Sequence, residues 1–164
     1  MHKTADSSLQ IAIANEQQTL AVDAPRWKQV IAAIVGDTEL TSAEISVAVV
    51  DDATIHRLNR EFLEHDYSTD VLSFVLDCDG EHLEGEIIVS ADTAASQAPQ
   101  FDWSAEDELL LYVIHGTLHL VGYDDKQTEA RARMRQAEAH YLNLLGVRPR
   151  GGDALETTEG EISP

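Results

Sequence analysis

The feature that most constrains this chain is an apolar segment that contains two histidines. SAEDELLLYVIHGTLHLVG (104–122) begins with Ser104, and Asp107 lies three residues on, as in a capping box, which predicts the start of a helix. The run that follows is apolar on nearly every face, so this helix must be buried. His115 and His119 are four residues apart and therefore share one face. Each buried imidazole without a partner costs about 1 to 3 kcal/mol, so the pair needs a shared partner.

A metal ion is the most economical partner for two buried imidazoles on one helical face. Gly122 can adopt the left-handed conformation that ends a helix, which would let the chain return and bring Asp124 or Asp125 to the ion. The residues alone do not choose between these two aspartates. Two histidines and one carboxylate leave a tetrahedral zinc ion one open position for water, as in catalytic sites. Nickel or ferrous iron suits the same ligands.

The alternative to a metal site is a pair of satisfied core histidines. For the HxxxH spacing alone this alternative is favoured, but the buried helix, the glycine stop and the aspartates after it favour the metal site. Gly116 stands where the HExxH motif of metalloproteases carries its general-base glutamate. This difference argues against a protease.

The rest of the sequence predicts a small α+β domain around this helix. Periodicity and turn residues predict strands at 8–14, 44–52, 69–76 and 85–92, and helices at 25–36, 52–63, 104–122 and 126–146. The last helix is amphipathic, with an apolar stripe of Ala130, Met134, Ala137, Tyr141, Leu144 and Leu145. The order of elements predicts a single α+β domain with a mixed sheet of about four strands, flanked by about five helices.

Composition sets the class of protein and the kinds of ligand available. With 164 residues and 43% hydrophobic content, the chain can bury one core, which we assign to 1–150, and 151–164 reads as an acidic tail that we expect to be disordered. No stretch has the length of a membrane span and the N-terminus has no apolar signal-peptide core, so we expect a cytoplasmic protein with no membrane partner. The single cysteine, Cys78, excludes an internal disulfide and a multi-cysteine zinc site.

Charge is distributed unevenly along the chain, whose net charge is −19. Residues 1–125 hold 5 Lys/Arg against 24 Asp/Glu, whereas residues 126–150 hold 6 against 2. The positive segment therefore follows directly after the candidate metal site. Arg131, Arg133 and Arg135 are simplest to interpret as a solvated helix face, and the sharper hypothesis is a local patch that contacts phosphate.

Three blocks of this sequence resemble the YbeY family of bacterial endoribonucleases and rRNA maturation factors. HGTLHLVGYDD (115–125) is similar to the family signature H-G-x-L-H-L-x-G-Y-D-H. LNREFLEHDYSTDVLSF (58–74) resembles the family segment from L-N to T-D-V-L-S-F, and GEIIVS (85–90) resembles its G-D-I-x-I-S strand. The blocks occur in the family order and spacing and cover residues 44–146.

The resemblance implies a metal-dependent hydrolase domain with a mixed sheet, a zincin-like metal helix and one zinc ion per chain. The ligands it implies are His115, His119 and Asp125, so it selects one of the two aspartates, and a zinc-bound water would be the attacking group. The activity implied is hydrolysis of single-stranded RNA, in late 16S rRNA 3′ end maturation and ribosome quality control. The partners implied are rRNA, the small ribosomal subunit and its associated factors.

This chain departs from the family pattern at three positions. The third ligand is commonly histidine, and Asp125 here lowers the net charge of the site by one unit. Leu63 stands where many members carry an arginine proposed to act in catalysis or phosphate contact, a role then absent or supplied by another residue such as Arg60. Glu86 replaces the usual aspartate of the G-D-I strand, a milder change.

Several further residues are candidates for helping the reaction or binding substrate. His65 and Asp66 precede the TDVLSF strand and are candidates for proton transfer, or for an ordinary polar turn. The candidates for substrate contact are Arg60, Asp70, Ser73, Tyr123 and Arg131, and the tyrosine is suited to stack on a base.

Two other functions remain open at this point. The first is a non-catalytic ribosome assembly factor, in which the metal only braces the fold and the basic helix contacts RNA or a ribosomal protein. The acidity of residues 1–125 and the presence of Leu63 favour it, since an acidic surface around an RNA-cleaving site needs explaining. The second is a metal-dependent hydrolase of a small molecule or peptide.

Overall fold

The structure is a computed structural model that describes residues 8–63 and 70–149. Four strands and five α-helices make up this part of the chain, together with one short 3₁₀ helix. In chain order they are β1 (Leu9–Asn15), α2 (Ala24–Gly36), β2 (Ser42–Val50), α3 (Asp52–Leu63), β3 (Val71–Cys78), β4 (His82–Ser90), α4 (Ala91–Gln97), η1 (Ala98–Phe101), α5 (Ala105–Leu120) and α6 (Thr128–Leu144). The predicted α+β domain with a four-stranded mixed sheet is confirmed.

The strands form one sheet in the order β1-β2-β4-β3. β1 pairs with β2 and β2 pairs with β4 in parallel, whereas β3 runs antiparallel to β4 at the edge of the sheet. Parallel neighbours need long crossover connections, and α2 lies in the connection from β1 to β2. β3 and β4 are joined by a tight turn in which Gly80 has a positive φ of 94°.

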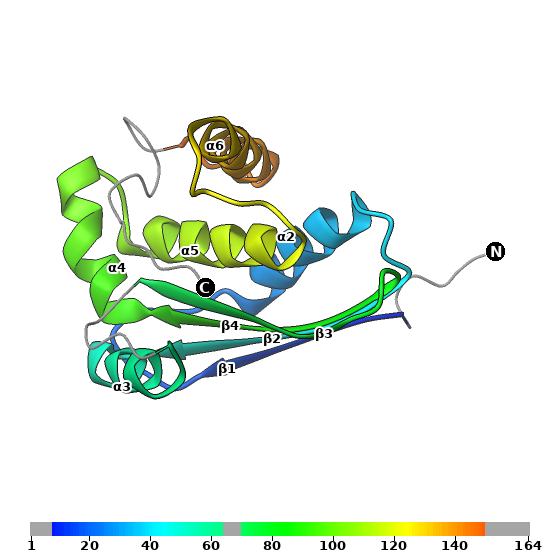
Figure 1. Cartoon of the computed structure of the whole chain (residues 1–164). Coiled ribbons are helices and arrows are strands. Elements are labelled where there is room, and N and C mark those ends of the chain that lie inside the picture. The colour runs from blue at the N-terminus through cyan, green and yellow to red at the C-terminus, as the bar shows by residue number, and fades with distance from the viewer. Residues whose placement is uncertain (1–7, 64–69, 150–164) are drawn as a thin grey trace.

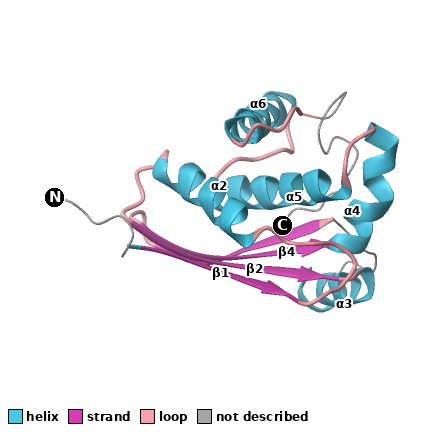
Figure 2. Ribbon diagram, turned by 180° about the vertical axis from the view of Figure 1, so that it is seen from behind, coloured by secondary structure: helices cyan, strands magenta, loops and turns pink. Residues whose placement is uncertain are grey.

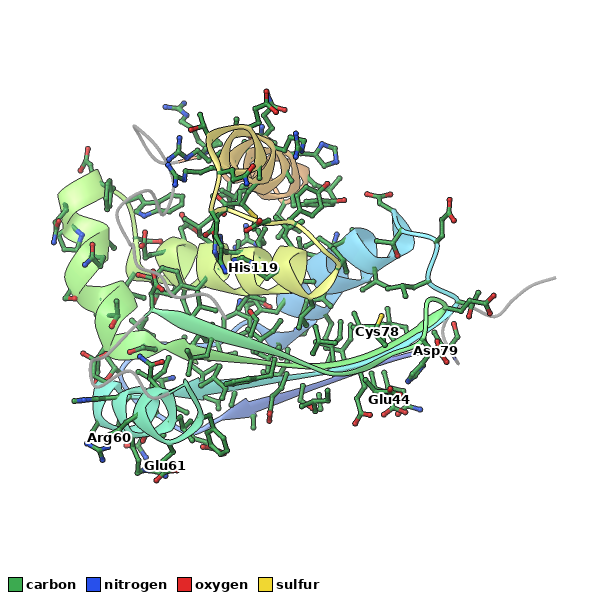
Figure 3. All side chains as sticks on the ribbon, viewed as in Figure 1. Glu44, Arg60, Glu61, Cys78, Asp79 and His119 are labelled. Carbon is green, nitrogen blue, oxygen red and sulfur yellow. The ribbon has the colours of Figure 1, made fainter. Side chains whose placement is uncertain are left out.

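The helices cover the two faces of the sheet unequally (Figure 1). α2 and α5 lie against one face, and α6 packs on the outer side of α5, an arrangement also seen from behind in Figure 2. α3 lies at one end of the opposite face, where Ile55 packs with Val50, Leu72 and Ile88. The strands contribute polar residues to the remainder of that face, among them the exposed Glu44 (Figure 3).

α5 is the buried centre of the fold, as its sequence predicts. The Ser104 side chain accepts a hydrogen bond of 3.0 Å from the backbone N–H of Asp107, so the predicted N-cap is confirmed. Every residue from Glu108 to Leu118 is buried, because the sheet lies on one side of the helix and α2, α4 and α6 lie on others. A helix enclosed in this way holds its side chains in fixed directions.

Gly116 allows α5 to approach the sheet closely. A Cβ atom at this position would lie 2.7 Å from Cγ2 of Ile87 and 3.2 Å from Cγ2 of Val71, both on neighbouring strands. Gly85 does the same from the sheet side, since its Cβ would lie 2.8 Å from Cδ1 of Leu120. Position 116 therefore faces the sheet, so a glutamate there would point into the core rather than act as the base of an HExxH site.

The sequence analysis missed α4, whose first two residues, Ala91 and Asp92, fell within a strand that was predicted too long. The prediction for 85–92 continues to Asp92, but β4 ends at Ser90. The Ser90 side chain accepts a hydrogen bond of 3.1 Å from the N–H of Thr93 and caps a helix that starts at once. Ser90 and Thr93 also donate hydrogen bonds to the carboxylate of Asp52, which ties the start of α4 to the start of α3.

Some predictions fall outside the residues that the structure describes. The acidic segment 151–164 is one of them, and the candidate helpers His65 and Asp66 are others. Within 8–63 and 70–149, no helix is both long and apolar enough to cross a membrane.

The close approach of α5 to the sheet predicts that Gly116→Ala destabilises the protein. The added methyl group would press on the buried side chain of Ile87, and such overpacking costs about 1 to 3 kcal/mol, more than the helix propensity gained from alanine, about 1 kcal/mol. The free energy of unfolding, measured by urea denaturation, should therefore fall. Gly36→Ala is the matched control, because no atom outside its chain neighbours and its own helix backbone lies within 4 Å of its Cβ position. Equal stability of the two variants would contradict this account of the packing.

Candidate metal centre

His115 and His119 lie one turn apart on α5 and face the same side. Their rings meet edge to face with centroids 4.7 Å apart. His115 is 7% exposed, and His119 is half-buried near the end of the helix, where Figure 3 labels it beneath the loop that leads to α6. The helical spacing read from the sequence therefore brings the two imidazoles together as predicted.

The turn after α5 returns the chain toward these histidines. Gly122 has a φ of 109°, its N–H donates to the carbonyl of His119, and the N–H of Tyr123 donates to the carbonyl of Leu118. This pair of bonds is a Schellman motif, which only a residue at ease in the left-handed region closes without strain. The predicted role of Gly122 is confirmed.

Asp125, and not Asp124, is the carboxylate that reaches the histidines. Its Oδ2 atom lies 3.5 Å from Nε2 of His115 and 3.6 Å from Nε2 of His119. Asp124 is exposed, and its Oδ1 accepts a hydrogen bond of 3.0 Å from the backbone N–H of Lys126. The structure thus makes the same choice of aspartate as the family signature.

The spacing of the three groups fits a single metal ion. Two ligand atoms bound to zinc at about 2.0 Å in tetrahedral geometry lie about 3.3 Å apart, close to the separations from Asp125. Nε2 of His119 is also buried without a hydrogen-bond partner among the described residues, a cost that an ion would remove. His115, His119 and Asp125 therefore form a possible metal site.

Glu138 on α6 holds His115 from the side opposite the ligand position. Its Oε2 lies 2.6 Å from Nδ1 of His115, and the side chain is almost fully buried. A carboxylate at Nδ1 fixes the ring orientation and leaves Nε2 for a metal, as in many metal sites with histidine ligands. The sequence analysis missed this residue, although Glu138 stands four residues after Met134 and three before Tyr141, on the buried stripe of the helix. Leu144, which was assigned to that stripe, is exposed because it lies off the buried side near the helix end.

The two carboxylates around His115 favour its charged form in the metal-free protein. Burial alone would lower the pKa of this imidazole, but its contacts with Asp125 and Glu138 raise that pKa to about 10. The His115 contact, followed by that of His119, holds the pKa of Asp125 well below its usual range. A metal binds neutral imidazole and must displace this proton, so its apparent affinity rises with pH.

Two further acidic residues, the half-buried Asp70 and the buried Glu108, interact with one another, and Asp70 also interacts with His115. Burial raises the pKa of the Asp70 carboxyl, whereas the charge of His115 lowers it. Glu108 accepts a hydrogen bond of 2.9 Å from Nε1 of Trp103. Burial thus favours the neutral form of Asp70, and the charge of His115 opposes this effect.

The other candidate residues occupy different positions around the fold. Ser73 is buried and its Oγ donates to the carbonyl of Gly116, a contact that joins β3 to α5. Arg60 is exposed on α3, on the face of the sheet opposite α5 (Figure 3). Tyr123 is 38% exposed just beyond the helix end. Arg131 is exposed on α6, and its Nε donates to the backbone carbonyl of Asp125 at 3.1 Å.

Comparison with known proteins places this centre in a family. The family model described as "Endoribonuclease YbeY" matches residues 12–146. This range includes the three candidate ligands and Glu138. The chain belongs to the YbeY endoribonuclease family. The predicted enzyme class, a hydrolytic nuclease, is confirmed by this membership.

Individual relatives agree with the family assignment. An endoribonuclease YbeY of Salinibacter ruber is 43% identical over 144 residues, which are 82% of this chain and 91% of that protein. One of Rhodopirellula baltica is 50% identical over 105 residues, 63% of this chain but only 54% of that longer protein. A solution structure of a Thermotoga maritima protein is similar with a TM-score of 0.57 and 27% identity, over 84% of this chain and 91% of the other.

The contact between Glu138 and His115 predicts that Glu138→Gln weakens metal binding. Loss of a carboxylate partner of a ligating histidine typically costs 10- to 100-fold in affinity, so we expect a fall of about that size. Competition with a chromophoric chelator measures it. Glu129→Gln removes the same charge from an exposed position of α6 and should change affinity far less. Equal effects of the two substitutions would show that only net charge matters at this site.

Proposed function

We propose that this protein is a zinc-dependent endoribonuclease specific for single-stranded RNA, acting in late 16S rRNA 3′ end maturation and ribosome quality control. The observation that carries the proposal is the convergence of His115, His119 and Asp125 at distances suited to one ion, in a chain of the YbeY family. Two nitrogen ligands and one oxygen ligand suit zinc, with one position left for the reaction.

The chemistry follows from how these side chains are held. A bound zinc ion would supply a Lewis acid for the phosphodiester and lower the pKa of a water molecule toward neutrality. Glu138 keeps Nε2 of His115 directed at the ligand position, and the buried helix α5 keeps both imidazoles in register. Asp125 adds a negative charge that a histidine ligand would not, which reduces the attraction of the centre for a phosphate.

The surroundings of the centre support a single-stranded substrate. Asp125 and His119 are partly exposed, so an extended strand can reach them from solvent. Tyr123 precedes Asp125 by two residues and presents an exposed ring, and stacking of a base on such a ring does not depend on sequence. A paired base is not available for such stacking.

One observation favours the rival function of a non-catalytic assembly factor. The four strands carry Glu44, Asp77, Glu84 and Glu86 and contain no lysine or arginine. Glu44 and Glu84 are in register on adjacent strands, where like charges repel. Such a face repels RNA and suits a basic protein partner, so metal binding could serve only to brace the fold.

Cleavage assays with purified protein distinguish these functions. We expect cleavage of an unstructured RNA, little cleavage of the same strand in a duplex, and loss of activity after removal of metal by a chelator. His119→Ala should lose the metal, by more than about a hundredfold in affinity, and the activity with it. His140→Ala removes an exposed histidine of α6 and should retain both. Cleavage by a folded, metal-free His119→Ala protein would exclude the proposed mechanism.

Complementation tests the cellular role separately. In bacteria that lack their own YbeY-family protein, the wild-type chain should restore mature 16S rRNA 3′ ends, measured by primer-based end mapping. The His119→Ala protein should fail while remaining folded by circular dichroism. If it restores processing without metal, the assembly-factor function replaces catalysis.

A further inference from the structure

Arg131 is hydrogen-bonded to the loop that supplies Asp125, the third ligand. Its Nε donates a hydrogen bond of 3.1 Å to the backbone carbonyl of Asp125, while the carboxylate of the same aspartate faces His115 and His119. The guanidinium is therefore held beside the centre by a residue of the centre itself. Arg131 is also exposed, so this group is open to solvent.

The guanidinium keeps most of its hydrogen-bonding capacity. One of its five N–H groups is used at Asp125, and the two terminal nitrogens carry the other four. Among residues 8–63 and 70–149, no carboxylate lies within ion-pair distance of Arg131. Two adjacent terminal nitrogens without an ion-pair partner match the geometry of two phosphate oxygens.

The charge of the centre explains why such a group is needed. The negative charges of Asp125 and the buried Glu138 would together cancel the charge of a divalent ion. The centre alone would then offer a phosphodiester no net positive charge, and the chain as a whole has a net charge of −19. A cation fixed beside the ion is the simplest way to overcome this repulsion.

The three arginines of α6 differ in their relation to the loop. Arg133 is exposed and lies about 200° around the helix from Arg131, because each residue of an α-helix turns by about 100°. Arg135 lies one turn further along and is half-buried among contacts of its own. Arg131 is therefore the member of this basic segment whose bond to Asp125 directs it to the centre.

We propose that Arg131 binds a phosphate of the RNA strand at the metal centre through its two terminal nitrogens, while its Nε stays on the carbonyl of Asp125. This inference rests on the proposed function, since it takes the substrate to be a phosphodiester. The proposal thus places the phosphate-binding arginine on α6, after the segment 115–125, and not on α3. The segment around Leu63 then need not supply it.

The test compares Arg131→Gln with Arg133→Gln, which removes the same charge from the same helix. Binding of a short single-stranded RNA to the metal-free proteins is measured over a range of salt concentrations. Arg131→Gln should weaken binding about tenfold or more and reduce the slope of log affinity against log salt by about 0.7, the value of one phosphate contact. Arg133→Gln should change both far less. Arg131→Lys should recover the salt slope but only part of the affinity, since lysine keeps the charge and lacks the two paired N–H donors of a guanidinium.

Two further measurements separate this role from a structural one. In steady-state cleavage by the metal-loaded proteins, Arg131→Gln should raise KM by a similar factor, and chelator competition should find its metal affinity unchanged. If Arg131→Gln lowers metal affinity as well as RNA affinity, the proposal is overturned, because Arg131 would then act only by holding Asp125. Equal binding losses in the Arg131 and Arg133 variants would also overturn it. A wild-type protein that neither binds nor cleaves RNA overturns the proposed function, and this inference with it.

Discussion

The contact of α5 with the sheet at Gly116 is the constraint on which the site depends. Because that side of the helix touches Ile87 and Val71 with no room for a Cβ, the rotation of α5 about its axis is fixed. His115 and His119 then lie about 60 to 100° around the helix from that contact, where they face Glu138 of α6 and Asp125 of the loop before it. A small change of this contact would turn both imidazoles together, so the core packing and the metal geometry are parts of one arrangement.

The sequence was sufficient for those parts of the fold that depend on local patterns. The Ser104 cap, the apolar run to Leu120 and the Gly122 stop are all local, and α5 lies within the predicted 104–122. α3 has the predicted bounds 52–63. α4 was missed because the seven residues from Ala91 to Gln97 have no apolar stripe long enough to show helical periodicity. Its start depends on the Ser90 side chain and on a contact with Asp52, far away in sequence.

The residues of the site likewise divide into those that local sequence identifies and those that only the structure shows. His115, His119 and Asp125 lie within eleven residues and were identified from the sequence, by spacing for the histidines and by family resemblance for the aspartate. Glu138 and the bond from Arg131 required the structure, since α6 packs across α5 in a register that helical periodicity does not fix. Periodicity marks Glu138 as buried but gives no partner. Arg60 lies on α3, across the sheet from α5, and its role in substrate contact stays a prediction.

The third ligand lies on the loop after Gly122, so its identity can change with little effect on the stability of the core. The loop residues from Gly122 to Asp124 are exposed, and the side chain of Asp125 lies at the boundary with solvent. An exchange between aspartate and histidine at this point therefore changes the charge of the centre and leaves in place the apolar side chains through which α5 packs on the sheet. The fold leaves the electrostatics of its metal centre open to single-residue evolution, and selection can retune the cations around it, such as Arg131, by equally small steps.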